Sequence, residues 1–173
     1  MSEAITPWLH ILAATIWVGP QFFLFLAAVP AIRTIEDCQT RARVMRIIVT
    51  RFGWLAWGAM AVIVLTGISN LFQVAADLNL NASDLIGSDY RFGRIFWEKM
   101  VLVGLTVLLT AVHTFIVGPR QMALNEQMEA DPGQVSRLRR LSIATSSLSL
   151  LLSIAVVFLA AVLANHNYSF QPT

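Results

Sequence analysis

The sequence predicts an all-α integral membrane protein, a bundle of four transmembrane helices with both termini on one side of the bilayer. Charged residues make up 13% of the 173-residue chain and hydrophobic residues 57%, whereas a soluble domain contains about 25% charged residues. Four long intervals, 4–32, 52–76, 100–119 and 141–173, contain no Asp, Glu, Lys or Arg. Each reaches the roughly 20 residues that a helix needs to cross the hydrocarbon core. A soluble four-helix bundle would carry charges along the outer face of every helix.

The first helix is expected at residues 7–32. Pro7 suits its first turn, where a missing N–H costs nothing, and Gly19-Pro20 is expected to kink it in mid-membrane. The segment is unlike a cleavable signal peptide, because it lacks a basic n-region, its apolar stretch is too long and three more spans follow.

The remaining helices are expected at residues 52–75, 95–118 and 141–164. Residues 37–51 are expected to extend the second helix beyond the hydrocarbon core, with arginines at the lipid headgroups. We interpret residues 1–173 as a single four-span domain, since the length suits one domain.

Two further signals concern the ends of the third and fourth helices. Gly118-Pro119 predicts that the third helix ends there. Asp131-Pro132-Gly133 predicts a turn before the fourth helix.

Basic residues are distributed unequally between the two sides of the predicted bundle. The loops around residues 33–51 and 119–140 contain nine, whereas the side with the termini contains Arg91, Arg94 and Lys99. The positive-inside rule therefore places the termini on the outer, periplasmic side of a bacterial plasma (inner) membrane. The small, dispersed net charge of +2 gives no indication of nucleic-acid binding, and a single cysteine excludes an internal disulfide.

The candidate metal ligands are the three histidines, His10, His113 and His166, which all lie in the spans or at their ends. An ionisable side chain within a membrane is costly to bury and usually marks function. His10 is expected near the outer face and His113 near the inner face, roughly 20 Å apart in depth at 1.5 Å per residue. They cannot share one metal ion, so either there are two sites or one of these histidines is structural.

The outer end contains further candidates for a cofactor site. Lys99 is expected at the depth of His10, and Arg91 and Arg94 stand just outside, where guanidinium groups suit the propionates of a haem. The alternative reading of Lys99 is a snorkelling residue paired with Glu98. His166 closes the fourth helix or lies beyond its end.

A polar stripe is expected along the third helix, on the face that carries Lys99, Thr106, Thr110 and His113. It should face the bundle interior and the serines of the fourth helix, either as interhelical hydrogen bonds or as a functional path. A second site that joins His113 to Met60 is a further alternative.

Three sequence motifs occur in order along the first three helices. They are Leu9-His10 followed by Trp17-Val18-Gly19, then Leu65-Thr66-Gly67, and then Tyr90-Arg91-Phe92-Gly93 followed by Lys99. The sequence resembles the membrane domain of the copper-resistance protein D family and, more distantly, the haem-dependent J-type protoporphyrinogen oxidases. The resemblance implies a haem-b or copper-handling membrane protein, in which His10 and Lys99 form the polar pair and His113 matches a later histidine of the oxidases. The Tyr-Gly motif has one extra residue here, and Gly19-Pro20-Gln21-Phe22 replaces the basic, aromatic signature of the oxidases.

The leading functional hypothesis is a haem-b protein that transfers electrons within or across the membrane. In this hypothesis His10 ligates iron, Arg91 or Arg94 holds propionates, and His166 or Lys99 supplies or supports the second axial position, with a second haem at His113. The partners would be haem and a quinone or a redox protein, in addition to the lipid bilayer.

Three alternatives belong to other functional classes. Copper transport or resistance is the first, although Met60 and Met100 are the soft ligands within the spans. A haem-dependent membrane oxidoreductase that acts on a porphyrinogen or a quinol is the second, and a homo-oligomer or subunit of a larger membrane complex is the third. The sequence contains no nucleotide-binding loop, nucleophilic triad or flavin fingerprint.

Overall fold

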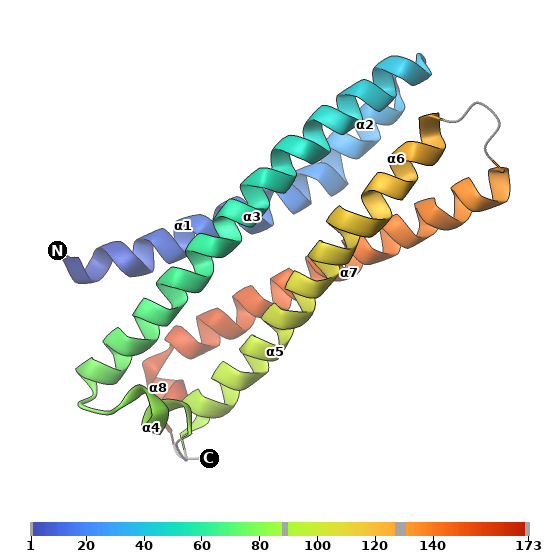
Figure 1. Ribbon diagram of the computed structural model, residues 1–173. Helices are drawn as coiled ribbons and strands as arrows, with labels where there is room; N and C mark the ends of the chain where they lie inside the picture. The colour runs from blue at the N-terminus through green and yellow to red at the C-terminus, as the bar shows by residue number, and fades with distance from the viewer. Residues whose placement is uncertain (1, 88–89, 127–130, 172–173) are drawn as a thin grey trace.

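The computed structural model describes residues 2–87, 90–126 and 131–171, and these residues form helices joined by short turns (Figure 1). Four long helical segments run through the molecule, and each contains one of the predicted spans. The segments are α1 (Ser2–Phe23) with η1 (Leu24–Ala28) and α2 (Val29–Arg33); α3 (Cys38–Asp77); α5 (Arg91–Val112) with η2 (His113–Val117) and α6 (Gly118–Glu126); and α7 (Pro132–Ala164). Two short helices, α4 (Ala82–Ile86) and α8 (His166–Ser169), follow the second and fourth segments.

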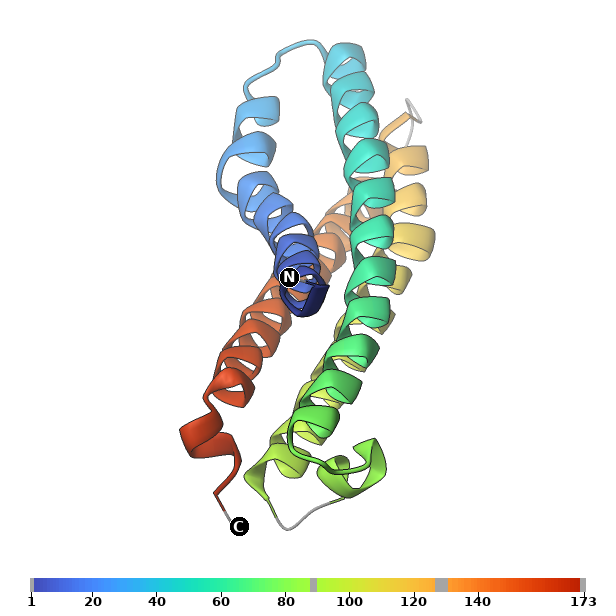
Figure 2. The same ribbon diagram turned by 90° about the vertical axis from the view of Figure 1, so that its left-hand side faces the viewer.

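The long segments form two antiparallel hairpins, in which α1 packs against α3 and α5 packs against α7 (Figures 1 and 2). Both chain termini lie toward one end of the bundle, together with α4 and α8. We call this the terminal end, and we call the opposite end, which holds the α2–α3 turn and the start of α7, the loop end. All four segments are long and apolar enough to cross a membrane, which confirms the predicted fold class.

Most apolar side chains of the bundle point outward. In the most hydrophobic window of each segment, at most 17% of the residues are buried, and Trp54 and Phe115 are 78% and 67% exposed. Such a surface would be a large apolar patch on a soluble protein, whereas lipid acyl chains solvate it in a bilayer. The buried core is correspondingly small, with one cluster formed by Trp17, Ala59 and Met60 between the two hairpin helices α1 and α3.

A second buried cluster, formed by Ala75, Leu85 and Phe92, fixes α4 at the terminal end. Gly93 is required here, because a Cβ at this position would lie 2.7 Å from the carbonyl oxygen of Ile86. The glycine of the third sequence motif therefore allows α4 to pack directly against the start of α5.

The third helical segment does not end at Gly118-Pro119, so this prediction was wrong. A π-helical turn, η2, precedes the proline, and the N–H of Gly118 donates to the carbonyl of His113, five residues back. The wider turn accommodates the proline ring, which would otherwise clash with a carbonyl one turn back. The helix then continues as α6 to Glu126.

The first segment contains a similar π-helical turn, which lies beyond the predicted kink site. Gly19-Pro20 lies within the regular α1 helix, whereas the π-helical turn η1 precedes Pro30 and the N–H of Val29 donates to the carbonyl of Leu24. Both π turns thus end two residues before a proline and lie toward the loop end.

Two aspartates begin the helices that start at the loop end. Asp37 accepts hydrogen bonds from the backbone N–H groups of Gln39 and Thr40, so α3 begins at Cys38 as the expected extension of the second span. Asp131 accepts from the backbone N–H of Gly133 and Pro132 occupies the first turn of α7, so the predicted turn signal is the start of this helix. Residues 127–130 of the preceding loop lie outside the described residues.

Candidate functional site

His10 lies on α1 toward the terminal end, and its ring is fixed by α3. Its Nδ1 atom is 2.8 Å from the Thr66 hydroxyl oxygen, and that hydroxyl lies 2.6 Å from the carbonyl oxygen of Val62, to which it donates. A hydroxyl has one proton, so the Thr66 oxygen must accept from an Nδ1–H of His10. The Nε2 atom of His10 then carries the lone pair, which is the form in which an imidazole binds a metal.

Gly67, the residue after Thr66, provides the space for this ring. A Cβ at position 67 would be 3.3 Å from Cε1 of His10, which is tighter than an ordinary van der Waals contact. The Leu65-Thr66-Gly67 motif therefore supplies both the hydrogen-bond acceptor and the room for His10.

The second hairpin repeats the arrangement at the loop end. The Nδ1 atom of His113 is 3.1 Å from the hydroxyl oxygen of Thr145 on α7, and Thr145 donates to the carbonyl of Leu141 at 2.9 Å. The same reasoning leaves Nε2 of His113 as the free lone pair. His10 and His113 thus lie toward opposite ends of the bundle in similar His–Thr pairs, and the structure does not bring them into one site.

Hydroxyl groups line the interface between α5 and α7, as the polar stripe predicted. Thr106 and Ser153 are fully buried, and the hydroxyls of Thr110 and Ser149 lie 3.4 Å apart. The sequence analysis missed Gln21, whose Nε2 atom lies 3.2 Å from the Ser153 hydroxyl and joins α1 to α7. Gln21 could have been noticed in the sequence, because it is a polar residue in the middle of an otherwise apolar span.

Among the described residues Glu98 forms its ion pair with Arg94, and not with Lys99 as the snorkelling alternative supposed. Glu98 binds Arg94 one turn away, with 3.0 Å between Oε1 and Nε, because side chains four residues apart share a helix face and adjacent ones do not. The Lys99 ammonium lies 5.8 Å from the ring centroid of Phe96.

His166 begins α8, beyond the end of α7 at Ala164. Its exposed side chain contacts the ring of Phe170 at a centroid distance of 5.2 Å. His166 therefore lies beyond the fourth span, which is one of the two positions predicted from the sequence.

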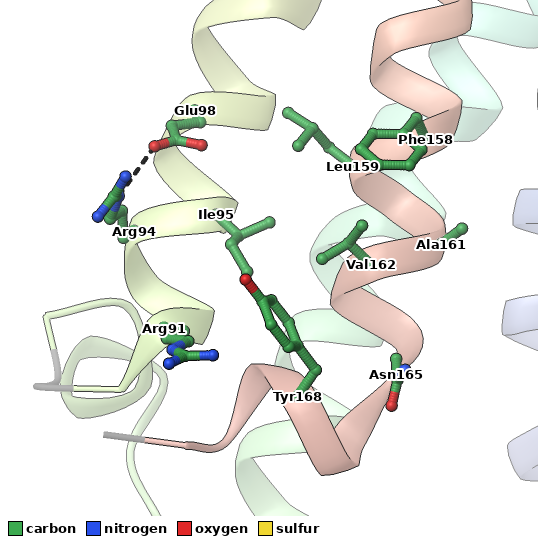
Figure 3. A pocket seen from close by; sticks show the side chains of 10 residues that line it. All are labelled: Arg91, Arg94, Ile95, Glu98, Phe158, Leu159, Ala161, Val162, Asn165 and Tyr168. Atoms are coloured by element: carbon green, nitrogen blue, oxygen red, sulfur yellow. Dashed lines mark hydrogen bonds and ion pairs between the residues drawn. The ribbon is translucent and has the colours of Figure 1, made fainter. Parts of the chain in front are cut away.

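Arg91 and Arg94 line a groove between the start of α5 and the end of α7 with α8 (Figure 3). The groove has a volume of about 880 Å³, and none of the described residues that line it is a histidine. The structure therefore does not gather the two arginines and His10 around one pocket.

No preformed multidentate metal site is found among the described residues. They contain no group of three or more His, Cys, Asp or Glu side chains with the spacing of a metal site, and Met60 packs against Trp17 and Ala59. Two buried polar atoms on α3 have no hydrogen-bond partner in the described part of the chain: Nε1 of Trp57, and Oδ1 of Asn70, which lies one turn beyond Thr66.

Comparison with protein families finds that the family model described as Copper resistance protein D matches residues 46–163, more than half of the chain. No curated protein and no solved structure matches the chain. The matched interval includes Thr66, Lys99, His113 and Thr145, whereas His10 precedes it.

Proposed function

The chain belongs to the copper resistance protein D family, and on that premise we propose that it handles copper at the bacterial inner membrane, with His10 as a copper ligand. The carrying observation is the fixed ring of His10, which binds Thr66 through Nδ1 and leaves Nε2 free. Imidazole nitrogen suits copper, and a hydrogen bond to the other ring nitrogen is the usual support of a metal-binding histidine.

Copper is the cargo in this proposal and not a permanent cofactor. The absence of a three-ligand cluster among the described residues favours weak, exchangeable binding over a closed structural site. His113 would bind copper in the same way toward the other end of the bundle, since Thr145 orients it as Thr66 orients His10. The unpaired Oδ1 of Asn70, one turn beyond Thr66 on α3, is a candidate for a second copper ligand.

We further propose that residues 1–173 act as one domain, because the Gln21–Ser153 hydrogen bond joins the two hairpins. The termini would face the periplasm, since nine basic residues lie on the loop side. His10 would then meet copper from the periplasm and His113 would lie toward the cytoplasm.

The test is the amount of Cu(I) that the purified protein binds at equilibrium in lipid nanodiscs, measured by competition with a Cu(I) chelator. We expect bound copper in the wild type, a loss of one copper equivalent in His10→Ala, and a separate loss in His113→Ala. His166→Ala is the matched control, because this histidine is exposed beyond α7. Equal copper binding in His10→Ala and the wild type would contradict the proposal.

A haem-b electron-transfer protein is the second candidate, favoured by two oriented imidazoles at opposite ends of the membrane. Haem iron takes a histidine through a free ring nitrogen, and each ring has one. The groove that contains Arg91 and Arg94 has no histidine among its described lining residues, which argues against these arginines binding the propionates of a haem on His10. Iron and the reduced visible spectrum are measured on the same samples. Stoichiometric iron with a b-type spectrum would favour the haem proposal over the copper proposal.

A further inference from the structure

The groove between α5 and α7 is amphipathic along its length. At the terminal end its lining is polar, with Arg91, Arg94 and Tyr168 (Figure 3). Further into the span the lining is mainly apolar and includes Ile95 and Phe158, which is 65% exposed, and Glu98 of α5 lies opposite at the level of Phe158 (Figure 3). Phe158 lies six residues before the end of α7 at Ala164, or about 9 Å at 1.5 Å per residue.

Arg91 is held in position at the mouth of the groove. Its backbone N–H donates to the carbonyl of Gln171 at 3.1 Å, and its guanidinium carbon lies 4.8 Å from the ring centroid of Tyr168. The ring of Phe170 stacks on Phe92 at 5.5 Å and anchors α8 to α5. The guanidinium is therefore placed by two elements that come from distant parts of the sequence.

The charged side chains that line the groove sum to one positive charge. Arg91 and Arg94 contribute two, and Glu98, which binds Arg94 through Nε, contributes one negative charge. This ion pair uses Nε of Arg94, and the terminal N–H groups of that side chain have no other partner in the described part of the chain. An occupant of matching chemistry has one negative charge at the headgroup level and an apolar tail about 9 Å or longer.

We propose that this groove binds an anionic phospholipid, with the phosphate on Arg91 and Arg94 and an acyl chain along Ile95 and Phe158. Arginine binds phosphate through paired N–H groups, and each basic residue near an anionic membrane surface contributes about fivefold in affinity. The proposal is independent of copper handling, because His10 does not line the groove.

The test is native mass spectrometry of the detergent-purified chain titrated with phosphatidylglycerol or phosphatidylcholine. We expect one phosphatidylglycerol to be retained in preference to phosphatidylcholine. Arg91→Gln should weaken this retention by about fivefold. Glu98→Gln raises the net charge of the groove and should strengthen the retention by a similar factor.

Two further variants separate a specific groove from general attraction of charge. Arg43→Gln removes the same charge at an exposed position on α3, far from the groove, and should leave the retention unchanged. Ala161→Trp fills the groove without changing the charge and should reduce the retention. Equal retention of both lipids, equal effects of Arg43→Gln and Arg91→Gln, or full retention in Ala161→Trp would overturn the proposal.

Discussion

At the scale of single residues, two threonine hydroxyls determine which nitrogen of each intramembrane imidazole is free. Thr66 and Thr145 each donate to a carbonyl of the preceding turn of their own helix. Each hydroxyl oxygen is then an acceptor for a histidine on the neighbouring helix. The backbone of one helix thereby selects the tautomer of a side chain on another, and both histidines present Nε2.

Replacement of Thr66 by valine tests this role, because the two side chains have similar shape and valine lacks the hydroxyl. Without its acceptor, Nδ1–H of His10 is unsatisfied and the ring loses its fixed orientation. We expect the copper affinity to fall about 10- to 100-fold, the usual effect of removing such a supporting hydrogen bond. The measurement is a copper titration in nanodiscs, with the helix content checked by circular dichroism.

Thr66→Ser retains the hydroxyl and should keep most of the affinity. Thr15→Val is the matched control, since Thr15 is exposed and its hydroxyl donates only to the carbonyl of Ile11 among the described residues. An unchanged copper affinity in Thr66→Val would show that the His10–Thr66 hydrogen bond does not contribute to copper binding.

His10 and His113 could be identified as candidate ligands from the sequence, but their hydrogen-bond partners could not. An ionisable residue in an apolar span is visible in a single chain. The hydrogen bond from His10 to Thr66 depends on the register of two helices whose contacting residues are 56 positions apart. Hydrophobic periodicity gives the face of a helix but not its vertical offset against a neighbour, so the tautomer and the free Nε2 atom required the structure.

At the scale of helices, the positions of the spans follow from charge and hydropathy, whereas signals for helix ends behave differently in a bilayer. Pro119 would end a helix in water, where freed carbonyls bind solvent. Within a membrane, backbone groups must be satisfied internally, and the π turn at residues 113–117 does this while the helix continues. Asp37 and Asp131 lie outside the spans and act as ordinary N-caps.

Asp37 gives the start of α3 a pH dependence. Hydrogen bonds from the Thr40 side chain and from the Thr40 and Gln39 backbone N–H groups, with a smaller contribution from Arg41, lower the pKa of Asp37 below its usual value. The capping stabilisation is therefore complete above the unfolded-state pKa, about 3.9, and is lost as the pH falls through the lower folded-state pKa. We expect the protection of the Gln39 and Thr40 amides against hydrogen exchange to decrease over this acidic range.

Asp37→Asn keeps an acceptor oxygen but cannot titrate, so the pH dependence of the protection should disappear. Asp37→Ala should remove the protection at neutral pH as well. The protection of the Gly133 and Gln134 amides, which follow the Asp131 cap of α7, is measured in the same samples. Substitution of Asp37 should leave this protection unchanged. Protection at Gln39 and Thr40 that does not change with pH in the wild type would show that the cap does not depend on the charge of Asp37.

At the scale of the whole molecule, the two hairpins are joined by few interactions within the membrane. The Gln21–Ser153 hydrogen bond links α1 with α7, and the rings of Trp57 and Phe115 meet at 5.6 Å. Four spans and termini on one side could be read from the sequence. The pairing of α1 with α3 and of α5 with α7, and the groove between α5 and α7, depend on packing that charge and hydropathy do not specify.

The orientation of the whole bundle is tested by its single cysteine. Cys38 is exposed at the first position of α3, at the loop end, and the excess of basic residues predicts that this end faces the cytoplasm. A membrane-impermeant maleimide should therefore leave Cys38 unlabelled in intact spheroplasts and label it in inverted vesicles. Ser83→Cys in a Cys38→Ser background is the control, because Ser83 is exposed on α4 at the terminal end and should give the opposite result. Labelling of Cys38 in intact spheroplasts would show that the bundle has the opposite orientation. His10, not His113, would then lie toward the cytoplasm.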